Sequence, residues 1–286
     1  MTSARCPASC GELIQGWIAG GEKLISCPID WYSEVDISEG SPTPNERPLS
    51  RRMLQQVTDY FGMQKGDIPP LRIDCRSTIP VAKGLASSTA DIAATAVATA
   101  RYLQRSLDEA TLAKLCLRLE PTDSTVFRAL TLFDHRQGAY RLTLDWLPRL
   151  TLLILESQDR LTTAACHQRI SDSDLRRQEA QLAGVWSLFQ KSCAGHSLRL
   201  LGEATTSSAL ARNQLLPKPG FDHLLSFVEH HDLYGLNVAH SGTVVGLLLD
   251  PQRHDPHRLR AELAQNVIYR HYPRQYVAAL VPGGVR

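Results

Sequence analysis

The side chains and glycines best suited to chemistry gather at residues 80–90, which read Pro-Val-Ala-Lys-Gly-Leu-Ala-Ser-Ser-Thr-Ala. Gly84 permits a positive φ or a close approach of backbone to a ligand, and Ser87 and Ser88 are good N-cap residues for the alanine-rich helix expected next. Such a loop leaves backbone N–H groups unpaired at the positive end of a helix dipole, which favours an anion. The alternative is an ordinary strand-to-helix turn. Because Lys83 precedes the glycine, the order Gly-Lys-Ser/Thr of a P-loop is absent.

Two carboxylates form a second chemical group at residues 120–124, Glu-Pro-Thr-Asp-Ser. Pro121 ends the preceding predicted helix and presents Glu120 and Asp123 three residues apart in a tight bend. In phosphoryl transfer, one carboxylate can complete Mg²⁺ coordination with a serine while the other accepts or positions the proton of the acceptor hydroxyl. Asp123 could instead cap a turn through an Asx interaction.

The periodicity of the chain predicts the elements that must position these groups. Residues 71–79 alternate as a strand before the loop, and a hairpin with its turn at residues 20–21 joins 13–18 to 24–37. Helical spacing predicts helices, and alternation or short apolar runs predict strands. The predicted helices are 49–61, 107–120, 175–193, 198–210, 222–230 and 256–269, and the other strands are 138–147, 150–155, 244–249 and 275–280. Strands and helices alternate after Pro148, which predicts an α+β fold with a boundary near residue 150.

Composition places the chain among ordinary globular proteins. Its 286 residues are 43% apolar and 21% charged, with a net charge of +2. Without a basic block we expect neither a nucleic-acid nor a membrane partner. No apolar run approaches the roughly 20 residues of a membrane span, and residues 1–11 lack the apolar core of a secretory signal, so we expect a cytoplasmic protein.

The cysteines and paired histidines are expected to be structural or exposed. The seven cysteines are odd in number and lack a disulfide-like framework, so buried reduced thiols are expected. A metal site at residues 6–10 would need a second close pair of ligands, which the sequence does not offer. We expect His230, His231, His254 and His257 at the surface.

Residues 80–90 resemble the phosphate-binding motif of the GHMP kinases, the family named for galactokinase and for homoserine, mevalonate and phosphomevalonate kinases. The resemblance implies a two-lobed α+β fold, with a ribosomal-protein-like ATP-binding lobe at 1–150 and a ferredoxin-like lobe at 151–286. It also implies ATP and Mg²⁺, with Ser88 and Glu120 holding the metal and Asp123 orienting or deprotonating the acceptor. Some relatives, homoserine kinase among them, work without a base. The implied ATP-binding residues are Pro80, Val81, Ala82, Lys83, Gly84, Leu85, Ala86, Ser87, Ser88, Thr89 and Ala90.

Residues 7–16, Pro-Ala-Ser-Cys-Gly-Glu-Leu-Ile-Gln-Gly, occupy the place of the first GHMP motif, whose polar residue contacts the acceptor. Many members carry another residue, such as Asn, at the position of Glu12. An acidic side chain there suggests an acceptor with a positive group, such as an amino acid's ammonium. The alternative is a solvated strand glutamate. The resemblance also assigns Ser9, Asp30 and Gly242 to substrate binding.

The third GHMP motif has a weaker counterpart at residues 240–246, His-Ser-Gly-Thr-Val-Val-Gly. It has fewer consecutive glycines than the family pattern, which argues against direct phosphate contact by Gly242 or Gly246. Asn213 is a candidate substrate-side residue, but an ordinary asparagine that ends a helix is the better account of it.

Within the family, residues 6–16 and 120–124 look like those of L-threonine kinases associated with propanediol utilisation and cobalamin synthesis. This implies conversion of ATP and L-threonine into ADP and O-phospho-L-threonine, the precursor of cobalamin's aminopropanol linker. The alternatives are a homoserine kinase, another small-alcohol kinase on the same scaffold, or a catalytically silent ligand sensor. For the assembly of the protein, we consider a homodimer.

Overall fold

The fold is α+β, as the sequence predicts, and it is built on one antiparallel sheet. A computed structural model describes residues 1–64, 66–159 and 170–286. In these ranges nine strands pair in the order β5-β4-β2-β1-β7-β8-β6-β9, with β3 added to β2. Their bounds are β1 Thr2–Ile18, β2 Gly21–Glu39, β3 Leu71–Ser77, β4 Thr131–Phe133, β5 Arg141–Thr143, β6 Thr151–Glu156, β7 Gly235–Val238, β8 Val245–Leu249 and β9 Arg274–Ala279.

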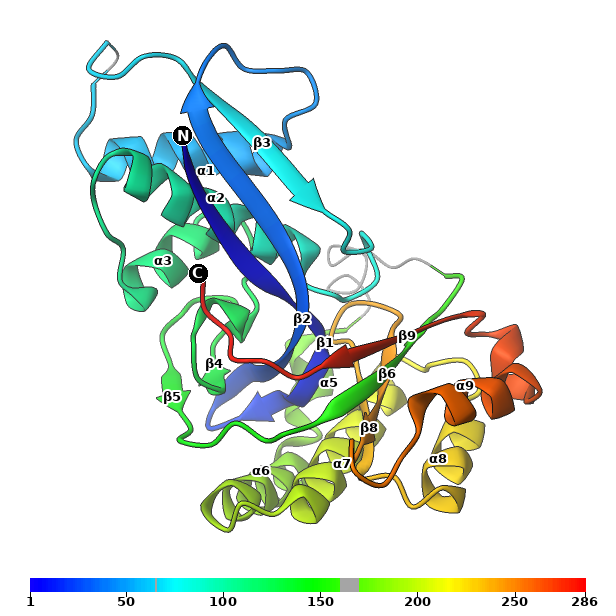
Figure 1. The fold of residues 1–286 in the computed structure, drawn as a ribbon. Helices are drawn as coiled ribbons and strands as arrows, with labels where there is room; N and C mark the ends of the chain where they lie inside the picture. Colours follow the sequence, from blue (N-terminus) through cyan, green and yellow to red (C-terminus); the bar gives the residue numbers. More distant parts are fainter. Residues whose placement is uncertain (65, 160–169) are drawn as a thin grey trace.

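The long β1–β2 hairpin runs through the middle of the molecule (Figure 1). Its turn lies at Ala19 and Gly20, both with positive φ, which confirms the predicted hairpin. One end of β2 pairs with β3 and the other with β4, while Glu12 of β1 pairs with Val238 of β7. Bulges interrupt the hairpin register between Pro7 and Ile14. Because bulges bend a strand and increase its twist, the hairpin changes direction where the two halves of the chain meet.

Three helices cover the N-terminal part of this hairpin. They are α1 Pro48–Tyr60, α2 Ser87–Tyr102 and α3 Glu109–Leu117, and the 3₁₀ turn η1 Ser124–Val126 follows. Helix α2 packs on β1 and β2, and α1 packs on α2. The alanines of α2 are fully buried in this contact, since a small side chain allows a helix to lie close to a sheet. The N-terminal end of α2, which follows the loop after β3, is therefore held firmly.

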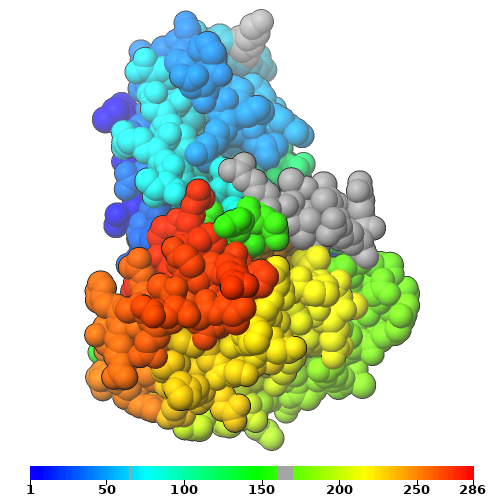
Figure 2. Space-filling model, turned by 90° about the vertical axis from the view of Figure 1, so that its right-hand side faces the viewer, coloured from blue at the N-terminus to red at the C-terminus, as the bar shows by residue number. Residues whose placement is uncertain are grey.

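The C-terminal helices lie on the other half of the sheet, and Figure 2 shows the late segments, yellow to red, below the N-terminal ones. Helices α6 and α7 pack on β1, and α7 also packs on β7. A second apolar core joins β6–β8 to α8, α9 and η2. The division near residue 150 stays a prediction, because the sheet continues from one half into the other. The bounds are α5 Asp172–Arg176, α6 Glu179–Ala194, α7 Leu198–Leu215, α8 Phe221–His230, α9 Pro256–Ala264 and η2 Val267–Arg270.

Several predicted elements differ in extent from the observed ones. The strand expected at 13–18 is part of the longer β1, and the helix expected at 198–210 continues to Leu215. The strand expected at 138–147 is limited to β5, the helix expected at 175–193 is divided into α5 and α6, and the helix expected at 256–269 ends at Ala264 before η2. Cys6, Cys10, Cys27, Cys75, Cys116 and Cys193 are free thiols, as predicted, and Cys166 lies outside the described residues. No helix in the described ranges has the length and apolarity needed to cross a bilayer.

Candidate active site

The loop between β3 and α2 has an unusual backbone that the rest of the fold holds in place. Ala82, Gly84 and Ala86 all have positive φ, at 61°, 85° and 56°. Ala86 is the residue before α2, and no side chain caps the helix. The prediction that Ser87 or Ser88 is the N-cap is therefore wrong, because the left-handed Ala86 places both serines inside the first turn. An uncapped helix N-terminus retains N–H groups that can bind an anion.

Strand β1 and the loop between β7 and β8 hold this turn in place. The N–H groups of Ser9 and Gly11 donate to the carbonyls of Leu85 and Gly84, and the N–H groups of Thr243 and Val244 both donate to Lys83 O. These bonds join the three sequence motifs into one site.

Ser88 and Glu120, the predicted metal pair, come together at the start of α2. Burial raises the pKa of Glu120, and the nearby Ser88 hydroxyl opposes the rise. A hydroxyl and a carboxylate are the hard oxygen donors that Mg²⁺ prefers. The donor set therefore fits the predicted Mg²⁺ site.

Asp123 lies close by and faces Thr89, the next residue of α2 after Ser88. The Thr89 hydroxyl donates to Asp123 Oδ2 at 2.9 Å, and the Asp123 N–H donates to Thr89 Oγ1 at 3.3 Å. Asp123 precedes η1 but its side chain makes no capping bond there, which argues against the Asx alternative. Burial, with a contribution from the Glu120 charge, raises the pKa of Asp123 to about 6, although the Thr89 hydrogen bond opposes the rise.

Glu12 is buried between Asp123 and two basic side chains, so it is not a solvated strand glutamate. Its side chain is 4% exposed, and Glu12 Oε2 accepts the His240 N–H at 2.5 Å. Burial and the Asp123 charge raise its pKa well above the ordinary value, while the His240 hydrogen bond and the charges of Arg212 and Lys218 lower it. The site thus has an acidic end at Asp123 and a mixed-charge end beyond Glu12.

Comparison with known proteins agrees with this geometry. The family described as GHMP kinases N terminal domain matches residues 49–128. An L-threonine kinase of Salmonella typhimurium (strain LT2) is 54% identical over 283 residues, which cover 99% of this chain and 94% of that protein. An L-threonine kinase of Citrobacter freundii is 53% identical over 285 residues, covering 100% and 99%. The chain belongs to the GHMP kinase family.

A solved mevalonate kinase shares the fold of this GHMP kinase with a TM-score of 0.72, covering 99% of this chain and 100% of that one at 15% identity. The predicted family and its fold are therefore confirmed.

Lys83 differs from the phosphate ligand that its place in the GHMP loop suggests. Its side chain is 3% exposed, and Nζ donates to the carbonyls of Ser157 and Asp159, each at 2.6 Å. Nζ also lies 3.6 Å from Glu156 Oε1. The ammonium group therefore ties the loop to the end of β6, and only the backbone of Lys83 remains in the predicted phosphate loop.

The other predicted substrate residues lie in different surroundings, and their role in substrate binding stays a prediction. Ser9 is buried, and its hydroxyl donates to Gly11 O and accepts the Cys27 N–H, which stabilises the bulge in β1. Asp30 is exposed and accepts the Ala279 N–H at 3.0 Å, so its described contact leads to β9 and the structure does not bring it to Glu12. Asn213 Oδ1 accepts the Lys218 N–H at 2.7 Å, as expected for an asparagine near a helix end.

Gly242 supports the loop rather than lining an open pocket. A Cβ atom on Gly242 would lie 2.2 Å from Gly84 N and from Lys83 C, and one on Gly84 would lie 2.2 Å from the Ala239 Cβ. Neither position has room for a side chain. The two glycines therefore let the third motif press directly against the phosphate loop.

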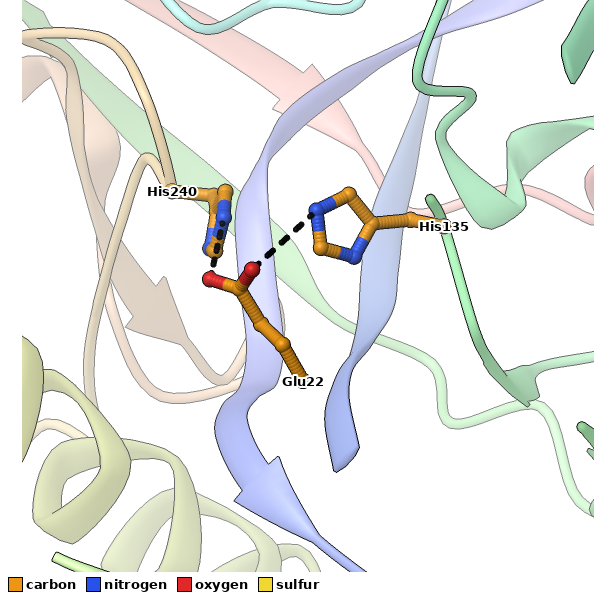
Figure 3. A group of neighbouring side chains, drawn as sticks. All are labelled: Glu22, His135 and His240. Carbon is orange, nitrogen blue, oxygen red and sulfur yellow. Dashed lines mark ion pairs between the residues drawn. The ribbon is translucent and has the colours of Figure 1, made fainter. Parts of the chain in front are cut away.

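Sequence reasoning missed a buried cluster of Glu22, His135 and His240 beside Glu12. Figure 3 shows both imidazole rings approaching the Glu22 carboxylate, one from the loop after β4 and one from the loop after β7. The rings lie 4.8 Å apart, edge to face. Burial would raise the pKa of Glu22, but His240, His135 and Arg212 together lower it. The three residues are more than 100 positions apart, so no local spacing in the sequence indicates the cluster.

Proposed function

We propose that this GHMP kinase transfers the γ-phosphoryl group of ATP to the side-chain hydroxyl of L-threonine. The observation that carries the proposal is the position of the Asp123 carboxylate, fixed by Thr89 next to the Ser88–Glu120 pair. The extent of identity to L-threonine kinases supports the choice of acceptor, because it covers 99% of the chain.

The nucleotide end of the site consists of the loop and the first turn of α2. The uncapped N-terminus of α2 and the loop backbone would bind the phosphates of ATP. Ser88 and Glu120 would hold Mg²⁺, which supplies charge neutralisation between the terminal phosphates. The rigid packing of Gly84 against Gly242 keeps the N–H groups in place before the nucleotide arrives, and such preorganised groups contribute most of the catalysis in phosphoryl transfer.

At the acceptor end, Asp123 would take the proton of the threonine hydroxyl. With a pKa of about 6, its carboxyl is mostly ionised at pH 7 and remains basic enough to accept a proton. Glu12 would bind the substrate ammonium. A bound ammonium adds positive charge beside the buried carboxylate and thereby favours its ionised form.

The proposal extends to the use of the product, the location of the protein, its assembly and its division into lobes, and the sequence resemblance supports these points. The product, O-phospho-L-threonine, would serve the aminopropanol linker of cobalamin. A cytoplasmic location, a homodimer and a division into lobes at 1–150 and 151–286 complete the proposal.

The test is the release of ADP from Mg-ATP in the presence of L-threonine, L-serine, L-homoserine, D-threonine, mevalonate or galactose. Selective turnover with L-threonine is the expected result. Turnover with L-homoserine alone would transfer the assignment to a homoserine kinase, and ATP binding without turnover of any acceptor would support a ligand sensor.

A further inference from the structure

Glu22, His135 and His240 bring three potential metal ligands together from three distant segments. His240 Nε2 lies 3.1 Å from Glu22 Oε1, and His135 Nε2 lies 3.9 Å from Glu22 Oε2. The ligand atoms all lie within 4.8 Å of one another. Two ligands of a tetrahedral Zn²⁺ ion, each about 2.0–2.1 Å from the metal, are about 3.4 Å apart. Small side-chain movements would therefore close the cluster around one ion.

The cluster is buried, and the hydrogen bonding of Gln15 orients one of its rings. Glu22, His135 and His240 are 8%, 3% and 4% exposed. Gln15 Nε2 donates to Val238 O at 2.9 Å, so Gln15 Oε1 is the atom that faces His240 Nδ1, at 3.0 Å. Nδ1 must then carry the hydrogen of a neutral His240 ring, and Nε2 presents its lone pair to Glu22. A polar group that fixes the second ring nitrogen in this way is characteristic of metal-binding histidines.

A lone pair that faces a carboxylate oxygen requires a cation between them. A proton on His240 Nε2 would bridge only His240 and Glu22. A single divalent ion could instead bind His240, Glu22 and His135 at once. The arrangement of two imidazoles around one carboxylate (Figure 3) therefore favours the metal.

A neighbouring cavity leaves room for a further ligand such as water. The cavity has a volume of about 200 Å³ and is lined by Glu22, Arg136, Arg212 and part of α5. Arg136 Nη1 lies 3.5 Å from Glu22 Oε2 and 2.9 Å from Asp172 Oδ1, and its side chain is 45% exposed. The charge of Arg212 acts on Glu12 as well as on Glu22. Each guanidinium is thus shared with a second carboxylate, which reduces its repulsion of a cation bound at Glu22.

We propose that Glu22, His135 and His240 bind one divalent transition-metal ion, with Zn²⁺ the best match. Two imidazoles and one carboxylate suit Zn²⁺, whereas the all-oxygen pair Ser88 and Glu120 suits Mg²⁺. The two sites would therefore take different ions. The zinc site would join the start of β2 to the loops after β4 and β7, and so link both halves of the chain.

The test uses the full chain purified without a histidine tag. Metal content is measured by inductively coupled plasma mass spectrometry after dialysis against a weak chelator, and the Zn²⁺ affinity by competition with a chromophoric chelator. The wild-type chain is expected to hold one equivalent of Zn²⁺. Glu22→Gln and His240→Gln are each expected to weaken binding at least tenfold, since each removes one of three protein ligands.

Two further variants separate ligation from misfolding. His135→Cys replaces one ligand by another, so its Co²⁺ form is expected to gain a thiolate-to-cobalt charge-transfer band that the wild-type Co²⁺ form lacks. His231→Gln removes a half-buried histidine outside the cluster, which pairs with Glu262 at 3.2 Å, and it should leave the bound zinc unchanged. A wild-type chain without metal and with a protonated His240 ring by NMR would overturn the proposal. Equal zinc loss in His231→Gln and Glu22→Gln, or no new band in His135→Cys, would overturn it too.

Discussion

Thr89 and Asp123 exchange two hydrogen bonds, one in each direction. The Thr89 hydroxyl donates to the Asp123 carboxylate and accepts the Asp123 backbone N–H. Thr89 lies in the first turn of α2, and Asp123 is the residue before η1. This pair therefore fixes the candidate base relative to the helix N-terminus, where the phosphates are expected.

The Thr89–Asp123 hydrogen bond should control the acid limb of the pH profile. If Asp123 acts as the base, kcat/KM will fall as the pH drops through about 6, where its carboxyl gains a proton. Thr89→Val removes a hydrogen bond that lowers the pKa of Asp123, so the limb should move to higher pH. Thr89→Ser keeps the hydroxyl and serves as the control. A limb at the same pH in wild type and Thr89→Val would contradict this role of the pair.

Asp123→Asn should slow the enzyme and stabilise the fold. Loss of a general base costs roughly a hundred- to ten-thousandfold in turnover. The folded pKa of about 6 lies above the ordinary value of 3.8, so the folded state binds the proton more tightly and stability is lost as the pH rises from about 4 to 6. Above that range the ionised carboxylate lowers the free energy of unfolding by up to about 3 kcal/mol.

The neutral asparagine side chain of the Asp123→Asn variant avoids this cost, so the midpoint of thermal unfolding at pH 7 should rise relative to wild type, and the difference should shrink at pH 4. Turnover within tenfold of wild type would favour a mechanism without a base. An unchanged melting midpoint at both pH values would instead contradict the raised pKa.

Substitutions of the adjacent residues Ser87 and Ser88 test which serine holds the metal ion together with Glu120. Ser88→Ala and Glu120→Gln should each lower kcat about a hundredfold, equivalent to about 3 kcal/mol, and raise the Mg²⁺ concentration needed for half-maximal rate. Ser87→Ala changes the preceding serine in the same turn and should keep the Mg²⁺ dependence of wild type. Equal effects of Ser87→Ala and Ser88→Ala on that dependence would argue against the assignment of Ser88. Circular dichroism checks that the variants are folded.

The contact between Gly242 and the phosphate loop can be tested by adding one methyl group. Gly242→Ala would place a Cβ 2.2 Å from backbone atoms of Lys83 and Gly84, so we expect a loss of about 1–3 kcal/mol in stability and a raised KM for ATP. Gly184→Ala is the matched control, because this exposed glycine in α6 has open space around it and alanine is the better helix former by about 1 kcal/mol. Gly184→Ala should therefore stabilise the protein and leave KM unchanged.

Sequence reasoning succeeded where local pattern decides structure. The alternation at 71–79, the β1–β2 hairpin and the alanine-lined α2 all follow from spacing and glycine content, although the hairpin turn lies at residues 19–20, one residue before the predicted 20–21. It failed where distant contacts decide. Ser87 and Ser88 have good capping chemistry, but the backbone of Ala86 is fixed by bonds around its loop from residues 9–11 and 243–244. The convergence of Glu22 with two histidines depends on strand pairing across the whole chain, which no short motif encodes.

Lys83 provides the sharpest contrast between motif and structure. A lysine that only bound phosphate would not contribute to stability in the absence of nucleotide. The Lys83 ammonium group instead donates to the Ser157 and Asp159 carbonyls within the protein. Lys83→Met keeps the aliphatic stem and leaves these carbonyls without their donor, so we expect a loss of about 1–3 kcal/mol in the free energy of unfolding without ATP. Chemical denaturation of the nucleotide-free protein measures this. Lys114→Met, an exposed lysine in α3, controls for loss of charge. A lysine that ties the loop to β6 must contribute to stability before any substrate is present. Therefore, if Lys83→Met and wild type unfold alike without ATP, while the variant no longer binds ATP, Lys83 is a phosphate ligand instead.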